Sequence, residues 1–122
     1  MLNCLMVGAG GFIGSIFRYL LGQIPLPEKT GFPFMTLLIN VTGALLIGFI
    51  VGITEKTGGL NPQVELFLKV GICGGFTTFS TFALETTQLL SGGKTAVALL
   101  YIILSVVLCV GAVMLGKLMV KA

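Results

Sequence analysis

The amino-acid sequence predicts an all-α membrane protein, in which four transmembrane helices form one domain over residues 1–122. Three observations predict this class. Apolar residues make up 56% of the chain and charged residues only 9%, whereas soluble domains carry about 25% charged residues. Four apolar stretches each reach the ~20 residues needed to cross a bilayer. The 18 glycines are typical of helices that pack closely in lipid.

Charged and turn-forming residues separate the apolar stretches. The stretches predict helices at about residues 2–22, 34–53, 64–90 and 95–120. The first stretch lacks the basic region of a cleavable signal peptide, so we expect it to remain as a helix. Pro25, Pro27 and Pro33 mark the first connector. Asn61 followed by Pro62 predicts the cap and first turn of the third helix.

The basic residues are divided almost evenly between the two sides of this bundle. The side with both termini collects four, and the opposite side three. The side with both termini has Lys56, Lys69, Lys117 and Lys121. The opposite side has Arg18, Lys29 and Lys94. Because an excess of Lys and Arg sets orientation, so small a difference predicts insertion both ways up and an antiparallel, dual-topology homodimer. A fixed orientation set by that one charge is the alternative.

The third helix is expected to be broken near residues 71–78. Glycines stand at positions 71, 74 and 75, and hydroxyl residues at 77, 78, 80 and 81. Both kinds of residue weaken helices. Non-helical backbone at membrane depth persists only where it is buried in protein or faces water, and broken helices of transport proteins hold ions with it. The break therefore favours ion handling over close packing alone.

Two phenylalanines follow the break. Phe79 and Phe82 are three residues apart and so share a helical face. An aromatic ring has a positive edge, so rings presented edge-on can stabilise an anion without a full positive charge. Conduction also needs binding weak enough to release the ion. The alternative is that both rings face lipid or the protein core.

Few other polar residues lie within the helices. Asn40 can donate two hydrogen bonds, and its alternative role is an interhelical bond. Tyr101 and Ser105 share one face of the fourth helix. Asn40, Tyr101 and Ser105 are expected in the same half of the bilayer as the two phenylalanine rings. This arrangement is typical of a narrow polar track. Arg18 and Glu85 lie ~6–8 Å inside one interface, where they either pair or snorkel; Arg18 is also suited to draw anions into a mouth.

Three segments carry a family resemblance. They are Gly-Gly-Phe-Ile-Gly-Ser-Ile-Phe-Arg-Tyr at 10–19, Thr-Leu-Leu-Ile-Asn-Val-Thr-Gly at 36–43 and Gly-Ile-Cys-Gly-Gly-Phe-Thr-Thr-Phe-Ser-Thr-Phe at 71–82. In these segments, and over nearly the whole length, the chain resembles the CrcB/Fluc family of bacterial fluoride channels.

The resemblance implies a dual-topology homodimer in the bacterial inner membrane, which exports fluoride passively through two parallel pores and so relieves fluoride toxicity. The fluoride pathway would consist of Asn40, Phe79, Ser80, Thr81, Phe82, Tyr101 and Ser105. Arg18 would stand in a vestibule. A structural sodium ion on the dimer axis would be held by the backbone carbonyls of Gly74 and Thr77 from both subunits.

Other functions fit the sequence less well. A small proton-coupled exporter of cationic drugs, also a four-helix antiparallel dimer, needs a membrane-embedded carboxylate, whereas Glu85 lies near an interface. A non-transporting assembly subunit would explain the glycines but not the hydroxyl-rich break. An enzyme is not expected, because no nucleophile–base pair or metal-ligand set is visible. The chain has no histidine, and its three cysteines predict neither a disulfide framework nor a zinc site.

Overall fold

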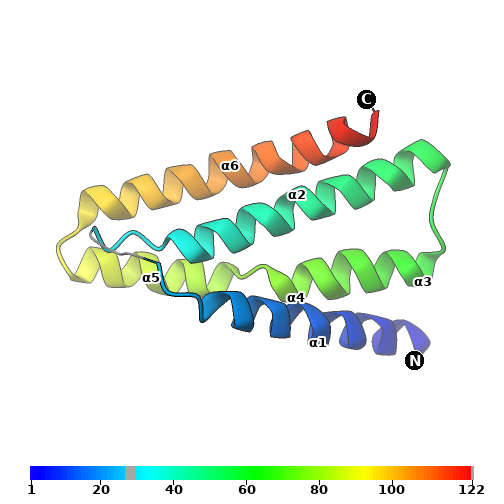
Figure 1. The fold of residues 1–122 in the computed structure, drawn as a ribbon, viewed down its shortest axis with the longest axis horizontal. Helices are drawn as coiled ribbons and strands as arrows, with labels where there is room; N and C mark the ends of the chain where they lie inside the picture. Colours follow the sequence, from blue (N-terminus) through cyan, green and yellow to red (C-terminus); the bar gives the residue numbers. More distant parts are fainter. Residues whose placement is uncertain (27–29, 122) are drawn as a thin grey trace.

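The computed structural model describes residues 1–26 and 30–121, and its described part is helical without strands (Figure 1). The elements are α1 (Leu2–Gly22), α2 (Phe34–Thr57), α3 (Pro62–Glu65), the π-helical stretch η1 (Leu66–Cys73), α4 (Gly74–Phe76), α5 (Phe79–Ser91) and α6 (Thr95–Lys121). Pro27 and Lys29, assigned above to the first connector and to the charge count, lie outside the described residues.

In the part of the chain that the structure describes, four helical segments are long and apolar enough to cross a membrane, as the sequence predicts. The third runs over Pro62–Ser91 and comprises α3, η1, α4 and α5. Its start is confirmed, since the Asn61 side chain accepts a hydrogen bond from the Gln63 N–H at 2.9 Å. Pro62 takes the first helical position, where its missing N–H costs nothing.

Helix α2 is longer than the sequence predicts. It continues past residue 53 to Thr57 and ends at Gly58, whose φ of 82° suits glycine. The charged residues near its end stay helical because each finds a partner on α6. Glu55 lies 3.1 Å from Lys117, and Lys56 donates to the Val120 carbonyl at 3.0 Å.

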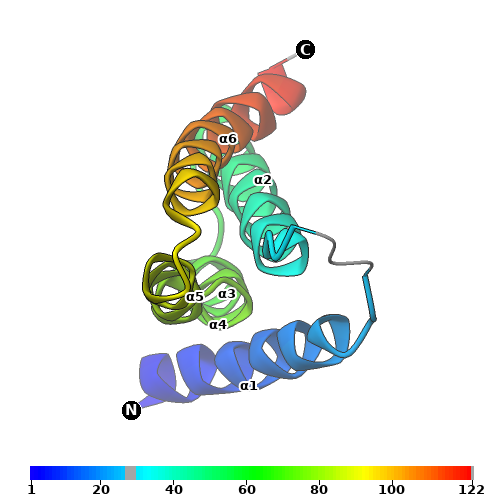
Figure 2. The same ribbon diagram turned by 90° about the vertical axis from the view of Figure 1, so that its left-hand side faces the viewer.

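The helices form two pairs, as the end-on view shows (Figure 2). Helix α2 packs along α6, while α1 packs against η1 and α4. Glycines allow both approaches: a Cβ on Gly48 would overlap the Val113 carbonyl oxygen of α6, and one on Gly14 would overlap the Ile72 carbonyl oxygen of η1. The GxxxG glycines at positions 10 and 14, and at 48 and 52, therefore pack within a single chain.

The expected break in the third span lies between α4 and α5. Thr77 and Thr78 are extended, with φ/ψ of −82°/158° and −147°/111°. Helix α5 then restarts with Thr78 as its N-cap, whose hydroxyl accepts from the Thr81 N–H at 3.1 Å. The preceding turns are π-helical, a conformation that often accompanies functional sites.

Candidate functional site

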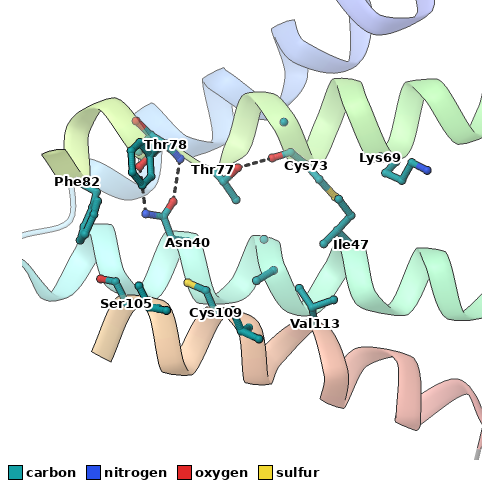
Figure 3. A pocket seen from close by; sticks show the side chains of 16 residues that line it. Asn40, Ile47, Lys69, Cys73, Thr77, Thr78, Phe82, Ser105, Cys109 and Val113 are labelled. Carbon is teal, nitrogen blue, oxygen red and sulfur yellow. Dashed lines mark hydrogen bonds between the residues drawn. The ribbon is translucent and has the colours of Figure 1, made fainter. Parts of the chain in front are cut away.

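A cavity of about 470 Å³ lies between the two helix pairs, next to the break (Figure 3). It collects side chains from α2, from the third span and from α6. The residues predicted above that line it are Asn40, Gly74, Thr77, Phe79, Phe82 and Ser105. Most of the remaining lining is apolar, contributed by aliphatic side chains and cysteines. The third span thus presents its break to this cavity.

The Asn40 side chain stabilises the non-helical backbone at the break through two hydrogen bonds to Thr78. Its Oδ1 accepts from the Thr78 N–H at 2.8 Å, and its Nδ2 donates to the Thr78 carbonyl at 3.1 Å. Asn40 Oδ1 therefore replaces the backbone acceptor that the Thr78 N–H would have in a continuous helix. An amide NH₂ has two protons, and only one of them is used here, so Asn40 keeps a donor for a ligand in the cavity that it lines. The interhelical bond and the ligand-donor role are thus compatible.

The break also frees backbone carbonyls. In an α-helix the Thr78 N–H would donate to the Gly74 carbonyl, and the Thr81 N–H to the Thr77 carbonyl. Here those N–H groups donate instead to Asn40 Oδ1 and to Thr78 Oγ1. The carbonyls of Gly74 and Thr77 lose their α-helical donors, and both residues line the cavity. Backbone oxygens without helical donors suit a small hard cation such as sodium.

Arg18 serves a third carbonyl freed by the break. Its Nε donates to the Gly75 carbonyl oxygen at 3.0 Å. A Cβ on Gly75 would lie 2.7 Å from the Gly11 carbonyl, so α1 presses closely on this side of the third span. Among the described cavity-lining residues, Arg18 is absent. The structure therefore places it behind the break, on the side of α1.

Glu85 does not pair with Arg18, and this alternative from the sequence is wrong. Its carboxylate accepts from the Tyr101 hydroxyl at 2.9 Å and from the Thr36 hydroxyl at 3.0 Å. The two charges belong to different helix contacts, since Arg18 turns to Gly75. Sequence reasoning missed this trio, although Glu85 follows Phe82 by three residues and so shares its helical face.

The aromatic residues form a continuous row. The ring centroids of Phe79 and Phe82 are 5.4 Å apart at an interplanar angle of 46°, and those of Phe82 and Tyr101 are 5.0 Å apart at 58°. Tyr101 is fully buried, whereas Phe79 is 79% exposed. A ring edge carries partial positive charge, and Phe79 and Phe82 both line the cavity. The row connects the cavity with the Glu85 trio.

The hydroxyls after the break form a cluster of their own. Thr78 Oγ1 lies 3.3 Å from Ser80 Oγ and 3.0 Å from Thr81 Oγ1. Neither Ser80 nor Thr81 belongs to the described lining of the cavity. The structure therefore brings them beside the break, in contact with Thr78, which does line the cavity.

Ser105 differs from these hydroxyls because it has no partner. Within the described part of the chain, its Oγ is the one buried side-chain polar atom that makes no hydrogen bond. It lines the cavity on α6, one helical turn from Tyr101. Buried polar groups are rarely left unpaired, so Ser105 is the clearest sign of a ligand site in the cavity.

A second, smaller pocket of about 320 Å³ lies at the end of the molecule that holds the first and third connectors. Glu85 and Lys94 both line it, together with Gln88. Glu85 thus separates a polar mouth from the aromatic row that leads to the large cavity. In the described residues, no cluster of three or more His, Cys, Asp or Glu side chains is placed to hold a metal.

A family model and several relatives of this chain point to the same protein family. The model of the CrcB-like protein, Camphor Resistance (CrcB) family matches residues 5–117. A protein of Ruminiclostridium cellulolyticum named "Fluoride-specific ion channel FluC" is 43% identical over 99% of this chain and 94% of its own length. A protein of the same name from Nitrobacter winogradskyi is 51% identical over 92% of this chain and 90% of its own.

A third relative with that name, from Rhizobium meliloti, is 44% identical over 100% of this chain and 98% of its own length. The matches therefore cover all four apolar helices, the break and the cavity. Four apolar helices in a chain with these relatives make it a multi-pass membrane protein. The chain belongs to the CrcB-like protein family.

Proposed function

We propose that this protein is a fluoride-selective ion channel, which exports fluoride passively from the cytoplasm. The observation that carries the proposal is the cavity, where the unpaired Ser105 hydroxyl, the spare Asn40 proton and two aromatic rings converge. Fluoride is small and strongly hydrated, so closely set donors must replace its water. The relatives named above are fluoride-specific ion channels, and an ion channel is not an enzyme.

In this proposal each residue has a distinct task. Asn40 and Ser105 donate hydrogen bonds to the anion, and Phe79 and Phe82 present ring edges to it. Tyr101 leads the ion on toward the mouth at Glu85. Ser80 and Thr81 supply hydroxyls beside the break, and Arg18 draws anions into a vestibule; these three roles rest on the family resemblance.

The cation-exporter alternative is less well supported. Proton-coupled export of a cation needs a carboxylate that faces the substrate, and no acidic residue belongs to the described lining of the large cavity. Glu85 instead accepts hydrogen bonds from Tyr101 and Thr36. The relatives' names also point to fluoride rather than to a drug cation.

The proposed assembly is an antiparallel, dual-topology homodimer in the bacterial inner membrane. One side of the cavity is apolar and open in a single chain: Phe79, Val106 and Val110 are exposed there. A second copy seated on this side would cover these side chains and complete two parallel pores. The nearly even division of basic residues supports insertion in both orientations.

A structural sodium ion at the subunit interface is also part of the proposal. The carbonyls of Gly74 and Thr77 would hold it, because the break deprives both of their α-helical donors. Bound there, the ion supplies positive charge that fixes non-helical backbone in place. We expect the purified dimer to melt at a higher temperature in sodium than in an equal concentration of potassium. Equal melting temperatures across both salts would contradict a sodium site.

The function is tested by fluoride-electrode efflux from proteoliposomes of purified protein, with chloride as the control anion. We expect rapid release of fluoride and no comparable release of chloride, without any proton gradient. Phe79→Ile and Phe82→Ile should lower fluoride flux while the dimer still assembles. Vesicles that retain fluoride, or that release chloride equally fast, would overturn the proposal; unchanged flux in both variants would overturn the role of the rings.

A further inference from the structure

Lys69 is a charge within a transmembrane segment that the proposed pathway leaves unexplained. Of the described residues that line the large cavity, Lys69 alone is charged. It lies at the end of the cavity away from Phe82 and Ser105, beyond Cys73 and Ile47 (Figure 3). Its position is seven residues after Pro62, so it stands ~10 Å inside the third span.

A lysine at this depth is costly unless it reaches water or a partner. Intramembrane charges therefore face water-filled cavities or the bundle interior, and they mark ion pathways. Lys69 meets both conditions: its side chain is 36% exposed, and its Nζ lies 3.1 Å from Glu65 Oε1. An ionised lysine at this depth is therefore accommodated best if this end of the cavity opens to water.

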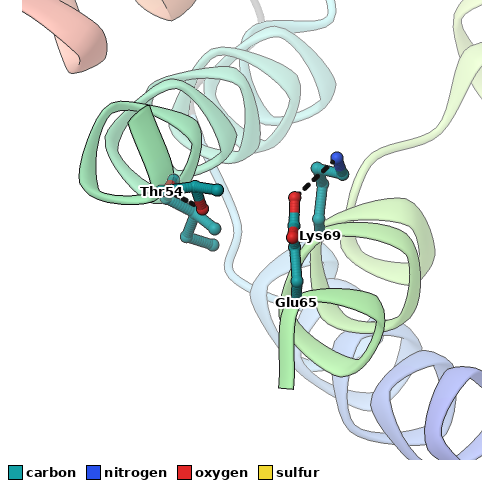
Figure 4. Close-up of polar contacts among 4 residues, drawn as sticks. Thr54, Glu65 and Lys69 are labelled. Atoms are coloured by element: carbon teal, nitrogen blue, oxygen red, sulfur yellow. Dashed lines mark hydrogen bonds and ion pairs between the residues drawn. The ribbon is translucent and has the colours of Figure 1, made fainter. Parts of the chain in front are cut away.

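Glu65 holds the lysine without entering the described lining of the cavity. Its side chain is 27% exposed and stands one helical turn before Lys69. Figure 4 shows both side chains on the side of their helix that faces α2, where Thr54 lies. The Thr54 hydroxyl donates to the Ile50 carbonyl at 3.0 Å. The neighbouring acid, Glu55, is paired with Lys117, so Glu65 is the carboxylate that balances Lys69.

We propose that Lys69, restrained by Glu65, is the charge that recruits anions at the mouth of the cavity opposite Glu85. This rests on the proposed fluoride channel and adds an entry site to it. An ammonium eight residues before the Thr77 break raises the local anion concentration and so the rate of entry. The adjacent carboxylate offsets part of that attraction and so limits the rate of entry.

A purely structural salt bridge predicts different behaviour. An exposed i,i+4 pair contributes little to stability, and its loss should leave flux unchanged at every salt concentration. Recruitment by charge must instead weaken as salt rises, because the Debye length falls from about 10 Å at 0.1 M to 3 Å at 1 M. The salt dependence of flux therefore separates the two roles.

The test measures initial fluoride efflux at low fluoride from proteoliposomes, at low and high concentrations of an impermeant salt. We expect Lys69→Gln to lower flux at low salt by about tenfold, with the difference largely lost at high salt. Lys69→Arg should retain flux. The matched control is Lys56→Gln, which removes the same charge at the same end of the molecule but outside the described lining; it should behave like the wild type.

Glu65→Gln gives an independent measurement should Lys69→Gln fail to assemble. By removing the balancing charge, it should raise flux at low fluoride and low salt. The inference is overturned if Lys69→Gln conducts like the wild type, if Lys56→Gln loses as much flux, or if Glu65→Gln leaves flux unchanged or lowers it. A wild-type protein that does not conduct fluoride would overturn the channel proposal itself.

Discussion

Ser105 combines two properties that rarely occur together, burial and the lack of a hydrogen-bond partner. Replacing an unpaired buried hydroxyl by a hydrogen atom, as in Ser→Ala, removes no hydrogen bond within the protein. We therefore expect Ser105→Ala to change the free energy of unfolding by less than ~1 kcal/mol. Fluoride flux should nevertheless fall by about tenfold or more, since a hydrogen bond to a charged group contributes about 1.5–3 kcal/mol.

The control for this prediction is Thr87→Ala on α5. It removes an exposed hydroxyl that donates to the Ala83 carbonyl of the same helix at 2.9 Å. Its flux should match that of the wild type. Thermal unfolding and fluoride efflux, measured on the same preparations, check both variants. A Ser105→Ala protein with lower stability and normal flux would show that the hydroxyl serves folding rather than the ion.

At the residue scale, the sequence predicts which side chains lie near one another better than it predicts their hydrogen-bond partners. The positions of Asn40, Phe79, Phe82 and Ser105 in one half of the bilayer follow from helical rise alone, and all four line one cavity. Their hydrogen bonds depend on how helices rotate against each other. That is why the contact of Glu85 with Tyr101 and Thr36 was not predicted.

Among the elements, α2 and α6 form a contact that depends on glycine. A Cβ on Gly48 would overlap the Val113 carbonyl, which belongs to the backbone and cannot move aside. We expect Gly48→Ala to lower the free energy of unfolding by about 1–3 kcal/mol through overpacking. Gly111→Ala is the control on α6, because nothing lies within 4 Å of its Cβ. It should be neutral or stabilise the helix by up to ~1 kcal/mol.

Thermal or denaturant unfolding of the purified protein in detergent checks this pair of variants. Equal stability of Gly48→Ala and the wild type would mean that the two helices are farther apart than the structure shows. Destabilisation by Gly111→Ala would place an unrecognised contact on the open face of α6. Either result would mean that α2 and α6, which form part of the cavity wall, pack differently from the structure.

Hydrophobic length predicts the elements well, but it does not predict their interior conformation. The break at Thr77 and Thr78 was expected from the density of glycine and hydroxyl residues. The π-helical turns of η1 were not, because the same apolar residues suit α- and π-helices. The end of α2 was misplaced for a related reason. Charged residues suggest an end of the apolar span, yet the helix continues wherever they find partners, as Glu55 and Lys56 do.

For the whole molecule, charge balance and the open cavity both support the proposed antiparallel homodimer. A single chain leaves Phe79 79% exposed beside its cavity, and its basic residues hardly distinguish one side of the membrane from the other. A partner inserted in the opposite orientation would cover the exposed Phe79 side chain. The even division of basic residues would allow both orientations to insert. Neither feature requires an additional domain or a second gene product.

This assembly predicts that neither orientation alone suffices for activity. A reporter fused to the carboxyl terminus should be detected on both faces of the membrane. Lysines appended after residue 122 should bias one copy with its termini toward the cytoplasm, and lysines placed at the exposed positions Ser91 and Thr95 should bias another the opposite way. Each biased protein should give little fluoride efflux when expressed alone, and their co-expression should restore it. Full efflux from either biased protein by itself would rule out an antiparallel pair, because every subunit would then share one orientation.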